Sequence, residues 1–351
     1  MSFKVAVVGA GRMGKLHARV LSEMEQADLV CVVDVDLAAA QSLARQRKCL
    51  ALASAEEAAG IVDAAVIATP TVQHVAAATP FVKAGKAVLI EKPFTDDLRS
   101  GRELIALAAS TGASVQVGHT ERFNAAFLAV RKYAIAPKFI EAHRISPFTF
   151  RSADVGVVLD MMIHDLDLVL LMAGGRCEEV QAVGINVIGR HEDICNARLT
   201  FDNGCVANVT ASRLAIKTER KMRVFSEEAY VSVDYGKKVG IVVKKSANLD
   251  LLQMARRMDV DDIADLAGNM DYTKLIKVEQ LEVDDSAEPL RRQAEAFART
   301  VMLGEAPVVP AEAGLAAIQC ADSILQAVRT HKWDGRGSAR EGLNILAGGG
   351  S

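Results

Sequence analysis

The sequence lacks the long apolar runs and the leader segment that would direct a protein to or through a membrane. No apolar run in the 351 residues approaches the length needed to span a bilayer, which argues against a membrane protein. The first residues, MSFKVAVVGAG, have no basic region, apolar core or small-residue cleavage site of a signal peptide. We therefore expect a cytoplasmic protein.

A surplus of basic residues is also missing. The chain has 41 Lys and Arg against 44 Asp and Glu, a formal net charge of -3 and a pI near 6.2. Proteins that bind nucleic acid need surplus cations to neutralise phosphates, so this balance argues against that class. A local basic patch for a small anionic ligand remains compatible with these numbers.

The motifs of several other functional classes are absent. The six cysteines form no C-x-x-C pair, and we expect free thiols in a reducing compartment. The seven histidines show no H-E-x-x-H and no paired Cys/His spacing, so the sequence predicts no metal site. A Ser-His-Asp hydrolase would need a G-x-S-x-G elbow, which the chain lacks.

The first 119 residues alternate short apolar runs with helical patterns. The runs are FKVAVV, LVCVVD, AAVIAT, AVLIE and SVQVG. Continuous β-branched runs between helices are typical of strands buried on both faces. The pattern predicts a dinucleotide-binding domain of Rossmann type over residues 1–119, built on a doubly wound parallel sheet.

From residue 120 the pattern changes to longer strands. The strand candidates are FIEAHRISPF, VQAVGINVIG, ICNARLTF, CVANVTASRL, KMRVFSEEAYVSVDY and GIVVKKS. Helices are predicted over Ala125–Tyr133, Pro289–Met302 and Ala311–Arg329, and DNG at Asp202–Gly204 predicts a hairpin turn.

We therefore expect an α+β domain over residues 120–335, with a large, mostly antiparallel open sheet covered by helices. A tail follows at 336–351, and residues 246–274 receive no assignment. A sheet face that helices leave open has to be buried elsewhere, which predicts a homodimer or homotetramer.

The segment VAVVGAGRMG has the G-x-G-x-x-G spacing between a predicted strand and a predicted helix, which indicates a dinucleotide site. Gly9 permits the tight turn, Gly11 lets the backbone approach a pyrophosphate, and Gly14 lets helix and strand pack closely. Arg12 and Met13 complete this loop.

The end of the second predicted strand favours NAD over NADP. Asp34 follows the last glycine of the motif by about twenty residues, where a carboxylate accepts hydrogen bonds from the ribose hydroxyls. The same carboxylate repels a 2′-phosphate, and the next residue is Val35 rather than a basic or hydroxyl side chain.

An apolar helical run, VVLDMMIHDLDLVL, contains three aspartates and a histidine. Ionised carboxylates are costly to bury unpaired. At about 100° per residue, Asp160, His164 and Asp167 fall in one stripe, whereas Asp165 points elsewhere. The stripe is either a satisfied buried network or a polar face offered to a ligand.

Four motifs decide between these readings: GAGRMGKLH, ATPTVQH, EKPF and the D-x-x-x-H spacing of Asp160 and His164. Together they resemble the Gfo/Idh/MocA family of sugar and inositol oxidoreductases. The resemblance implies NAD as cofactor, with Lys92 beside the nicotinamide and the substrate hydroxyl. It further implies His164 as the base. Asp160, one helical turn earlier, can orient its ring or bind a neighbouring hydroxyl of the substrate, and Asp167 is expected to be structural. Neutral imidazole has a suitable pKa for removing the hydroxyl proton near neutral pH.

The same motifs assign further residues to the cofactor site. These are Thr69, Pro70, His74 and Glu91, together with Lys92. We expect His17 and His74 to have structural rather than catalytic roles, and the Lys92–Pro93 bond is a candidate cis peptide.

GHTERFNAA and DVGVVLD resemble one branch of the family, the UDP-N-acetylglucosamine 3-dehydrogenases. The resemblance implies oxidation of the sugar C3 hydroxyl, with the ketone passed to a transaminase for a 3-amino sugar, as in some lipid A pathways. A diphosphate needs cations, and Arg122, Arg144 and Arg151 are the candidates. Asn124 is a candidate for the sugar or the nicotinamide amide. The branch often has proline where this chain has Ala125.

Two alternatives stay open. One is the same chemistry on another sugar or an inositol, in which case Ala125 would reflect lost recognition of UDP. The other is a non-catalytic regulator that senses NAD on the same fold. The coexistence of Lys92, Asp160 and His164 argues against the regulator, because a sensor does not need all three.

Overall fold

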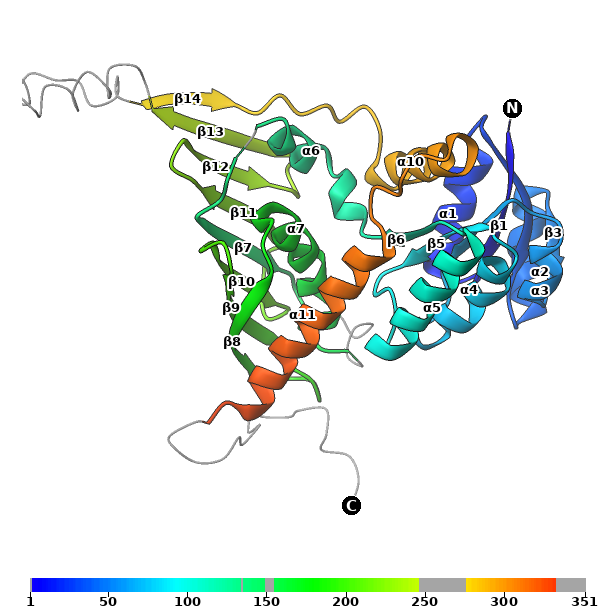
Figure 1. Cartoon of the computed structure of the whole chain (residues 1–351), viewed down its shortest axis with the longest axis horizontal. Coiled ribbons are helices and arrows are strands. Elements are labelled where there is room, and N and C mark those ends of the chain that lie inside the picture. Colours follow the sequence, from blue (N-terminus) through cyan, green and yellow to red (C-terminus); the bar gives the residue numbers. More distant parts are fainter. Residues whose placement is uncertain (1, 134, 149–154, 246–275, 333–351) are drawn as a thin grey trace, which may run out of the picture.

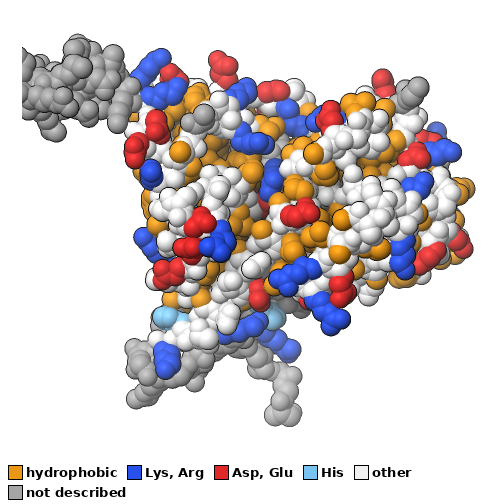
Figure 2. Space-filling model, in the orientation of Figure 1, with side chains coloured by type: hydrophobic (Ala, Val, Ile, Leu, Met, Phe, Trp, Pro, Cys, Tyr) orange, Lys and Arg blue, Asp and Glu red, His pale blue; other side chains and the backbone are white. Residues whose placement is uncertain are grey.

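The computed structural model describes residues 2–133, 135–148, 155–245 and 276–332 (Figure 1). A six-stranded sheet and an eight-stranded sheet form two domains, with helices between and around them. Lys, Arg, Asp and Glu side chains are interspersed over the face shown in Figure 2, as the small net charge leads one to expect. None of the described helices is both long enough and apolar enough to cross a membrane.

The first sheet is parallel throughout, with strand order β3-β2-β1-β4-β5-β6. Its strands are β1 (Phe3–Val8), β2 (Ala27–Val33), β3 (Leu50–Leu52), β4 (Ala64–Ile67), β5 (Ala87–Glu91) and β6 (Val115–Gly118). The helices are α1 (Arg12–Ser22), α2 (Leu37–Arg47), α3 (Ala55–Ala59), α4 (His74–Lys83) and α5 (Leu98–Thr111), with the 3-10 turn η1 (Thr71–Gln73). The predicted doubly wound sheet is confirmed.

The strand order of this sheet reverses between β1 and β4, and ligands of such sheets bind at the carboxyl ends of the strands near that point. The glycine loop follows β1, the Thr69–Pro70 segment follows β4, and Lys92 follows β5. The topology therefore collects the predicted cofactor residues at one edge.

The second sheet has the order β14-β13-β12-β11-β7-β10-β9-β8 and is antiparallel except for the β7–β10 pair. Its strands are β7 (Phe139–Ile145), β8 (Cys177–Ile185), β9 (Ile194–Phe201), β10 (Val206–Ser212), β11 (Glu219–Phe225), β12 (Ala229–Asp234), β13 (Val239–Lys245) and β14 (Ile276–Gln280). The mostly antiparallel sheet is confirmed, while β14 was not predicted.

The helical elements after β6 are η2 (Thr120–Phe123), α6 (Ala125–Arg131), the π-helical turn η4 (Val158–Met162), α7 (Ile163–Ala173), α10 (Pro289–Leu303) and α11 (Ala311–Thr330). One face of the second sheet packs on α7 and α11, because alternate residues of β9 and β10 are buried in a shared core. The predicted homo-oligomer stays a prediction.

Two C-terminal helices return to the first domain. On α10, Phe297 shares a core with β1, and its ring meets Phe3 edge-on with 6.4 Å between centroids. Helix α11 contributes Ile318 to the core of the first domain and Ile324 to that of the second (Figure 1). The helices α10 and α11 belong to the range predicted as the second domain, 120–335, but they pack on the first domain. They thereby hold the two domains in position relative to each other.

We predict that Phe297→Ala lowers the free energy of unfolding by about 3–5 kcal/mol, because a fully buried ring is removed from the core beneath α10. Urea unfolding would measure the loss. Met302→Ala on the same helix is the matched control, since Met302 is 37% exposed; there we expect a change of at most about 0.5 kcal/mol. Equal effects of the two changes would contradict the packing described here.

Candidate active site

The glycine loop leaves room for a pyrophosphate. Gly9 has φ +102°, and a Cβ there would lie 2.6 Å from the carbonyl oxygen of Ala68. A Cβ on Gly14 would lie 1.7 Å from the carbonyl oxygen of Gly9, whereas a Cβ on Gly11 would meet nothing within 4 Å. The two outer glycines therefore permit close packing, and the space above Gly11 at the start of α1 is open for a phosphate group.

Asp34 holds this loop from the end of β2. Its Oδ2 accepts a 2.7 Å hydrogen bond from the N–H of Ala10, and its Oδ1 accepts one of 2.9 Å from the N–H of Asp36. The neighbouring Val35 side chain is 97% exposed and offers no donor to a 2′-phosphate. The residues present thus fit NAD.

Two buried histidines fix the loops that follow β4 and β5. His17 Nε2 lies 2.6 Å from Glu91 Oε1. The ring nitrogens of His74 lie 2.8 Å from the carbonyl oxygen of Pro93 and 3.0 Å from that of Thr69. Both histidines are thereby occupied in holding backbone and side chains, the role that the sequence predicts for them.

Lys92 reaches across from the first domain to the second. Its Nζ donates a 2.8 Å hydrogen bond to the carbonyl oxygen of Asp160 and lies 3.6 Å from Asp160 Oδ1. Burial lowers the pKa of Lys92, while the carboxylates of Asp160 and Glu91 oppose that shift. The Lys92–Pro93 peptide bond is cis, as proposed from the sequence.

The polar residues of η4 and α7 divide among three environments. Asp160 and His164 line one pocket with Lys92. Asp165 accepts hydrogen bonds of 2.7 and 2.9 Å from Arg144, and Asp167 accepts two of 2.7 and 2.6 Å from Arg122. The predicted single stripe is wrong for Asp167, which lines a different pocket from Asp160 and His164 and is held there by Arg122 from η2.

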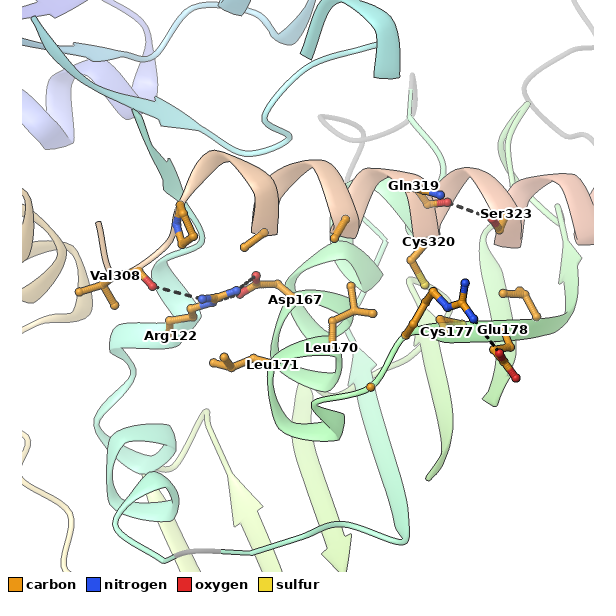
Figure 3. A pocket seen from close by; sticks show the side chains of 16 residues that line it. Arg122, Asp167, Leu170, Leu171, Cys177, Glu178, Val308, Gln319, Cys320 and Ser323 are labelled. Carbon is orange, nitrogen blue, oxygen red and sulfur yellow. Dashed lines mark hydrogen bonds and ion pairs between the residues drawn. The ribbon is translucent and has the colours of Figure 1, made fainter. Parts of the chain in front are cut away.

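The pair of Arg122 and Asp167 does not line the pocket that contains Lys92. Figure 3 shows the two side chains pointing toward one another beneath α11, and Arg122 Nη1 also donates to the carbonyl oxygen of Val308. They line a separate cavity of about 620 Å³. The structure therefore does not bring Arg122 to the pocket of His164, and it gives Asp167 the structural partner expected of it.

The pocket that contains Lys92, Asp160 and His164 has a volume of about 310 Å³. The first domain contributes Arg12 and Lys92, and the second contributes the rest of the lining. The remaining side chains are Arg144, Ile145, Ser146, Pro147, Met161, Arg213 and Arg220. Of these, Arg213 and Arg220 were missed from the sequence, because Arg213 stands near the end of one strand-like run, Arg220 stands directly before another, and neither belongs to a motif.

His164 is set up to accept a proton. Burial lowers its pKa well below the ordinary value, and the positive charges of Lys92 and Arg144 lower it further. Its Nδ1 is buried without a partner in the part of the chain that the structure describes. The imidazole is therefore neutral near pH 7, the form that accepts a proton.

One predicted substrate ligand, Asn124, does not line this pocket. Asn124 caps α6, accepting from the N–H of Ala126 at 3.0 Å and donating to Glu121 at 3.1 Å. Ala125 is the first residue of that helix, a position where proline is common. Alanine or proline at this position therefore affects the start of the helix. Arg151 lies outside the described residues.

Comparison with known families agrees with this geometry. Residues 3–119 match the oxidoreductase family with an NAD-binding Rossmann fold, and residues 113–232 match the GFO/IDH/MocA C-terminal domain. The predicted oxidoreductase class and the NAD cofactor are confirmed by these matches.

The chain is similar to two groups of dehydrogenases that are named for different substrates. It is 38% identical over 233 residues to UDP-N-acetylglucosamine 3-dehydrogenase of Acidithiobacillus ferrooxidans, covering 66% of this chain and 74% of that protein. It is 33% identical over 200 residues to inositol 2-dehydrogenase of Rhizobium meliloti, covering 54% and 61%.

A solved structure of UDP-N-acetylglucosamine 3-dehydrogenase from Acidithiobacillus ferrooxidans superposes with a TM-score of 0.81 at 29% identity, over 93% of this chain and 98% of that one. A solved structure from Sinorhizobium meliloti superposes with a TM-score of 0.72 at 23% identity, covering 93% of this chain and 97% of that one, which shows the shared fold.

We predict that Gly11→Ala leaves the unfolding temperature unchanged but weakens NAD binding by about tenfold or more, because the new methyl group takes the space of the pyrophosphate. Gly14→Ala is the comparison. It should weaken NAD binding and also lower the unfolding temperature, because its Cβ would clash with the backbone carbonyl of Gly9. Thermal unfolding and calorimetric titration with NAD would measure both. Wild-type NAD affinity in Gly11→Ala would contradict the assignment of this loop.

We also predict that kcat/KM falls on the acid side with a midpoint below about pH 6.5, the ordinary pKa of histidine. The base works only when neutral, and burial and nearby cations lower the pKa of His164, so activity persists until the pH falls through that lowered value. A pH–rate profile measures the midpoint. A midpoint above the ordinary histidine value would exclude His164, in this environment, as the base.

Proposed function

We propose that this chain, which belongs to the Gfo/Idh/MocA family of oxidoreductases, oxidises the C3 hydroxyl of UDP-N-acetylglucosamine to a ketone with NAD⁺. The observation that carries the proposal is the meeting of Lys92 from one domain with Asp160 and His164 from the other in a single pocket. The similarity to the dehydrogenase of Acidithiobacillus ferrooxidans supports the choice of substrate.

The residues divide the chemistry of alcohol oxidation between them. The hydroxyl oxygen gives up a proton and C3 gives up a hydride, for which bound NAD⁺ supplies the acceptor at nicotinamide C4. His164 takes the proton, a contribution of about 10²- to 10⁴-fold for a positioned base. Lys92 donates a hydrogen bond to the oxygen as negative charge develops there.

Asp160 positions rather than reacts. Its carbonyl oxygen and its carboxylate hold the Lys92 ammonium at 2.8 and 3.6 Å, so the lysine points at the same pocket as the imidazole one helical turn further on. Orientation of this kind lowers the activation free energy by several kcal/mol, because the reacting groups are already held in a productive geometry.

We place the reaction in the cytoplasm, because all six cysteines are free thiols, which reducing conditions preserve. The ketone is a substrate for a transaminase, which would give a 3-amino sugar of the kind used in lipid A. We also propose that the open face of the second sheet forms a homodimer or homotetramer interface.

The second candidate is the same oxidation on an inositol, supported by the similarity to inositol 2-dehydrogenase. The same lysine, aspartate and histidine would serve it. A regulator that only senses NAD is the third candidate. It is disfavoured because the pocket holds a neutral imidazole beside a desolvated lysine, a combination that binding alone does not need.

The test is NADH formation from UDP-N-acetylglucosamine and NAD⁺, run beside myo-inositol, glucose and NADP⁺. A transaminase with an amino donor is added to remove the ketone, so that an unfavourable equilibrium cannot hide the reaction. We expect NADH with the nucleotide sugar alone. NADH formation with myo-inositol alone would show that the substrate is a polyol. If none of the substrates gives NADH although NAD binds, the regulator is favoured.

We predict that Lys92→Ala lowers kcat by about 10³-fold or more while NAD affinity stays within about twofold, because the lost ammonium acts on the developing alkoxide. Stopped assays and NAD titration would measure the two quantities. Lys221→Ala is the control, since this lysine pairs with Glu219 on the second sheet and does not line the pocket. An unchanged kcat in Lys92→Ala would contradict the role of Lys92 in stabilising the alkoxide.

A further inference from the structure

Cationic side chains predominate in the lining of the pocket around His164. Five cationic side chains line it against a single carboxylate, that of Asp160, among the described residues. The five are Arg12, Lys92, Arg144, Arg213 and Arg220. Neighbouring carboxylates outside the lining can neutralise some of them, so each cation has to be examined for its partner.

Three of the five have a close carboxylate. Lys92 lies 3.6 Å from Asp160 Oδ1. Arg213 Nε donates to Asp193 Oδ1 at 2.6 Å. Arg144 makes two hydrogen bonds to Asp165 and a third, of 2.9 Å, to Glu121, and despite its burial these carboxylates raise its pKa. These three cations are held in place by the protein.

Arg220 and Arg12 are not neutralised in this way. The nearest carboxylate of Arg220 is Glu121, whose Oε1 lies 3.7 Å from its Nη1 and already accepts a 2.9 Å hydrogen bond from Arg144. The Arg220 side chain is 48% exposed. Within the described ranges, Arg12 has no carboxylate within 4.0 Å and is exposed at the start of α1.

The strand register adds a second observation. Arg220 on β11 is directly opposite Arg144 on β7, and both lie on the face that holds the buried Met222. Like charges directly opposite on neighbouring strands are destabilising. Arg144 has Asp165 as a partner of its own, whereas Arg220 only shares Glu121 with Arg144, so a bound anion at this edge of the pocket would stabilise Arg220.

We propose that Arg220 binds the diphosphate of the nucleotide-sugar substrate, with Arg12 lining the same site from the first domain and Arg144 behind it. The inference rests on the proposed function and names the residue that selects its substrate class. A guanidinium matches a phosphate with two parallel hydrogen bonds. An inositol or free hexose has no charge to match Arg220, so this side chain favours nucleotide sugars over polyols.

The experiment is calorimetric titration of UDP alone into the wild type and into Arg220→Gln, with steady-state kinetics on UDP-N-acetylglucosamine beside it. We expect UDP to bind at least about tenfold more weakly to the variant, since hydrogen bonds to charged groups are the stronger class. KM should rise by a similar factor with kcat nearly unchanged, because the diphosphate takes no part in the proton and hydride transfers at C3.

Arg223→Gln is the matched control. Arg223 lies on the same strand, is similarly exposed at 52%, and pairs with Glu141 at 3.4 Å on the opposite face of the sheet. UDP affinity and KM should remain at wild-type values in this variant. Loss of UDP affinity in both variants would indicate a general effect of charge and would overturn the assignment.

The outcomes separate this inference from the proposed function. If the wild type oxidises UDP-N-acetylglucosamine and Arg220→Gln binds UDP as tightly as the wild type does, the subsite is wrong and the function stands. If the wild type binds UDP through Arg220 but does not oxidise the sugar, the subsite stands and the function is wrong. A wild type that does not bind UDP would overturn the subsite.

Discussion

The hydrogen bond from Lys92 to Asp160 is the contact on which the site depends, because it joins the two domains at the reacting pocket. Neither domain holds a complete site. Lys92 is placed by the strand β5 and by the buried pair of His17 and Glu91 beside it, whereas Asp160 and His164 come from the helix of the other domain. The helices α10 and α11, which pack on the first domain or on both, keep this contact in register.

The rotation of α7 about its own axis is set by charge. Its apolar residues would bury almost equally well in several orientations, but Asp165 and Asp167 each have one arginine to meet. Breaking a buried pair of this kind costs about 3–5 kcal/mol, because an unpaired charge remains in the interior. These two pairs lie about 200° apart around the helix axis and therefore select one orientation, in which His164 lines the same pocket as Lys92.

The periodic features of the sequence were enough to predict both sheets. The grouping of Lys92 with Asp160 and His164, which line one pocket, was implied by the resemblance of their motifs to a known family. Local patterns failed where partners come from far along the chain. Arg122 stands beside predicted substrate residues but meets Asp167, and Arg220 has no motif yet reaches the pocket through its register with β7. The π-helical first turn was also missed, since its spacing depends on the packed structure rather than on residue types.

The central claim is that C3 of the sugar gives up a hydride in this pocket, and isotope transfer tests it most directly. UDP-N-acetylglucosamine carrying deuterium at C3 would be incubated with the enzyme and NAD⁺, and both products would be examined by mass spectrometry. The account predicts that the deuterium leaves the sugar and is recovered in the reduced cofactor. Reduced cofactor without deuterium, beside a ketone that still carries the label, would contradict it.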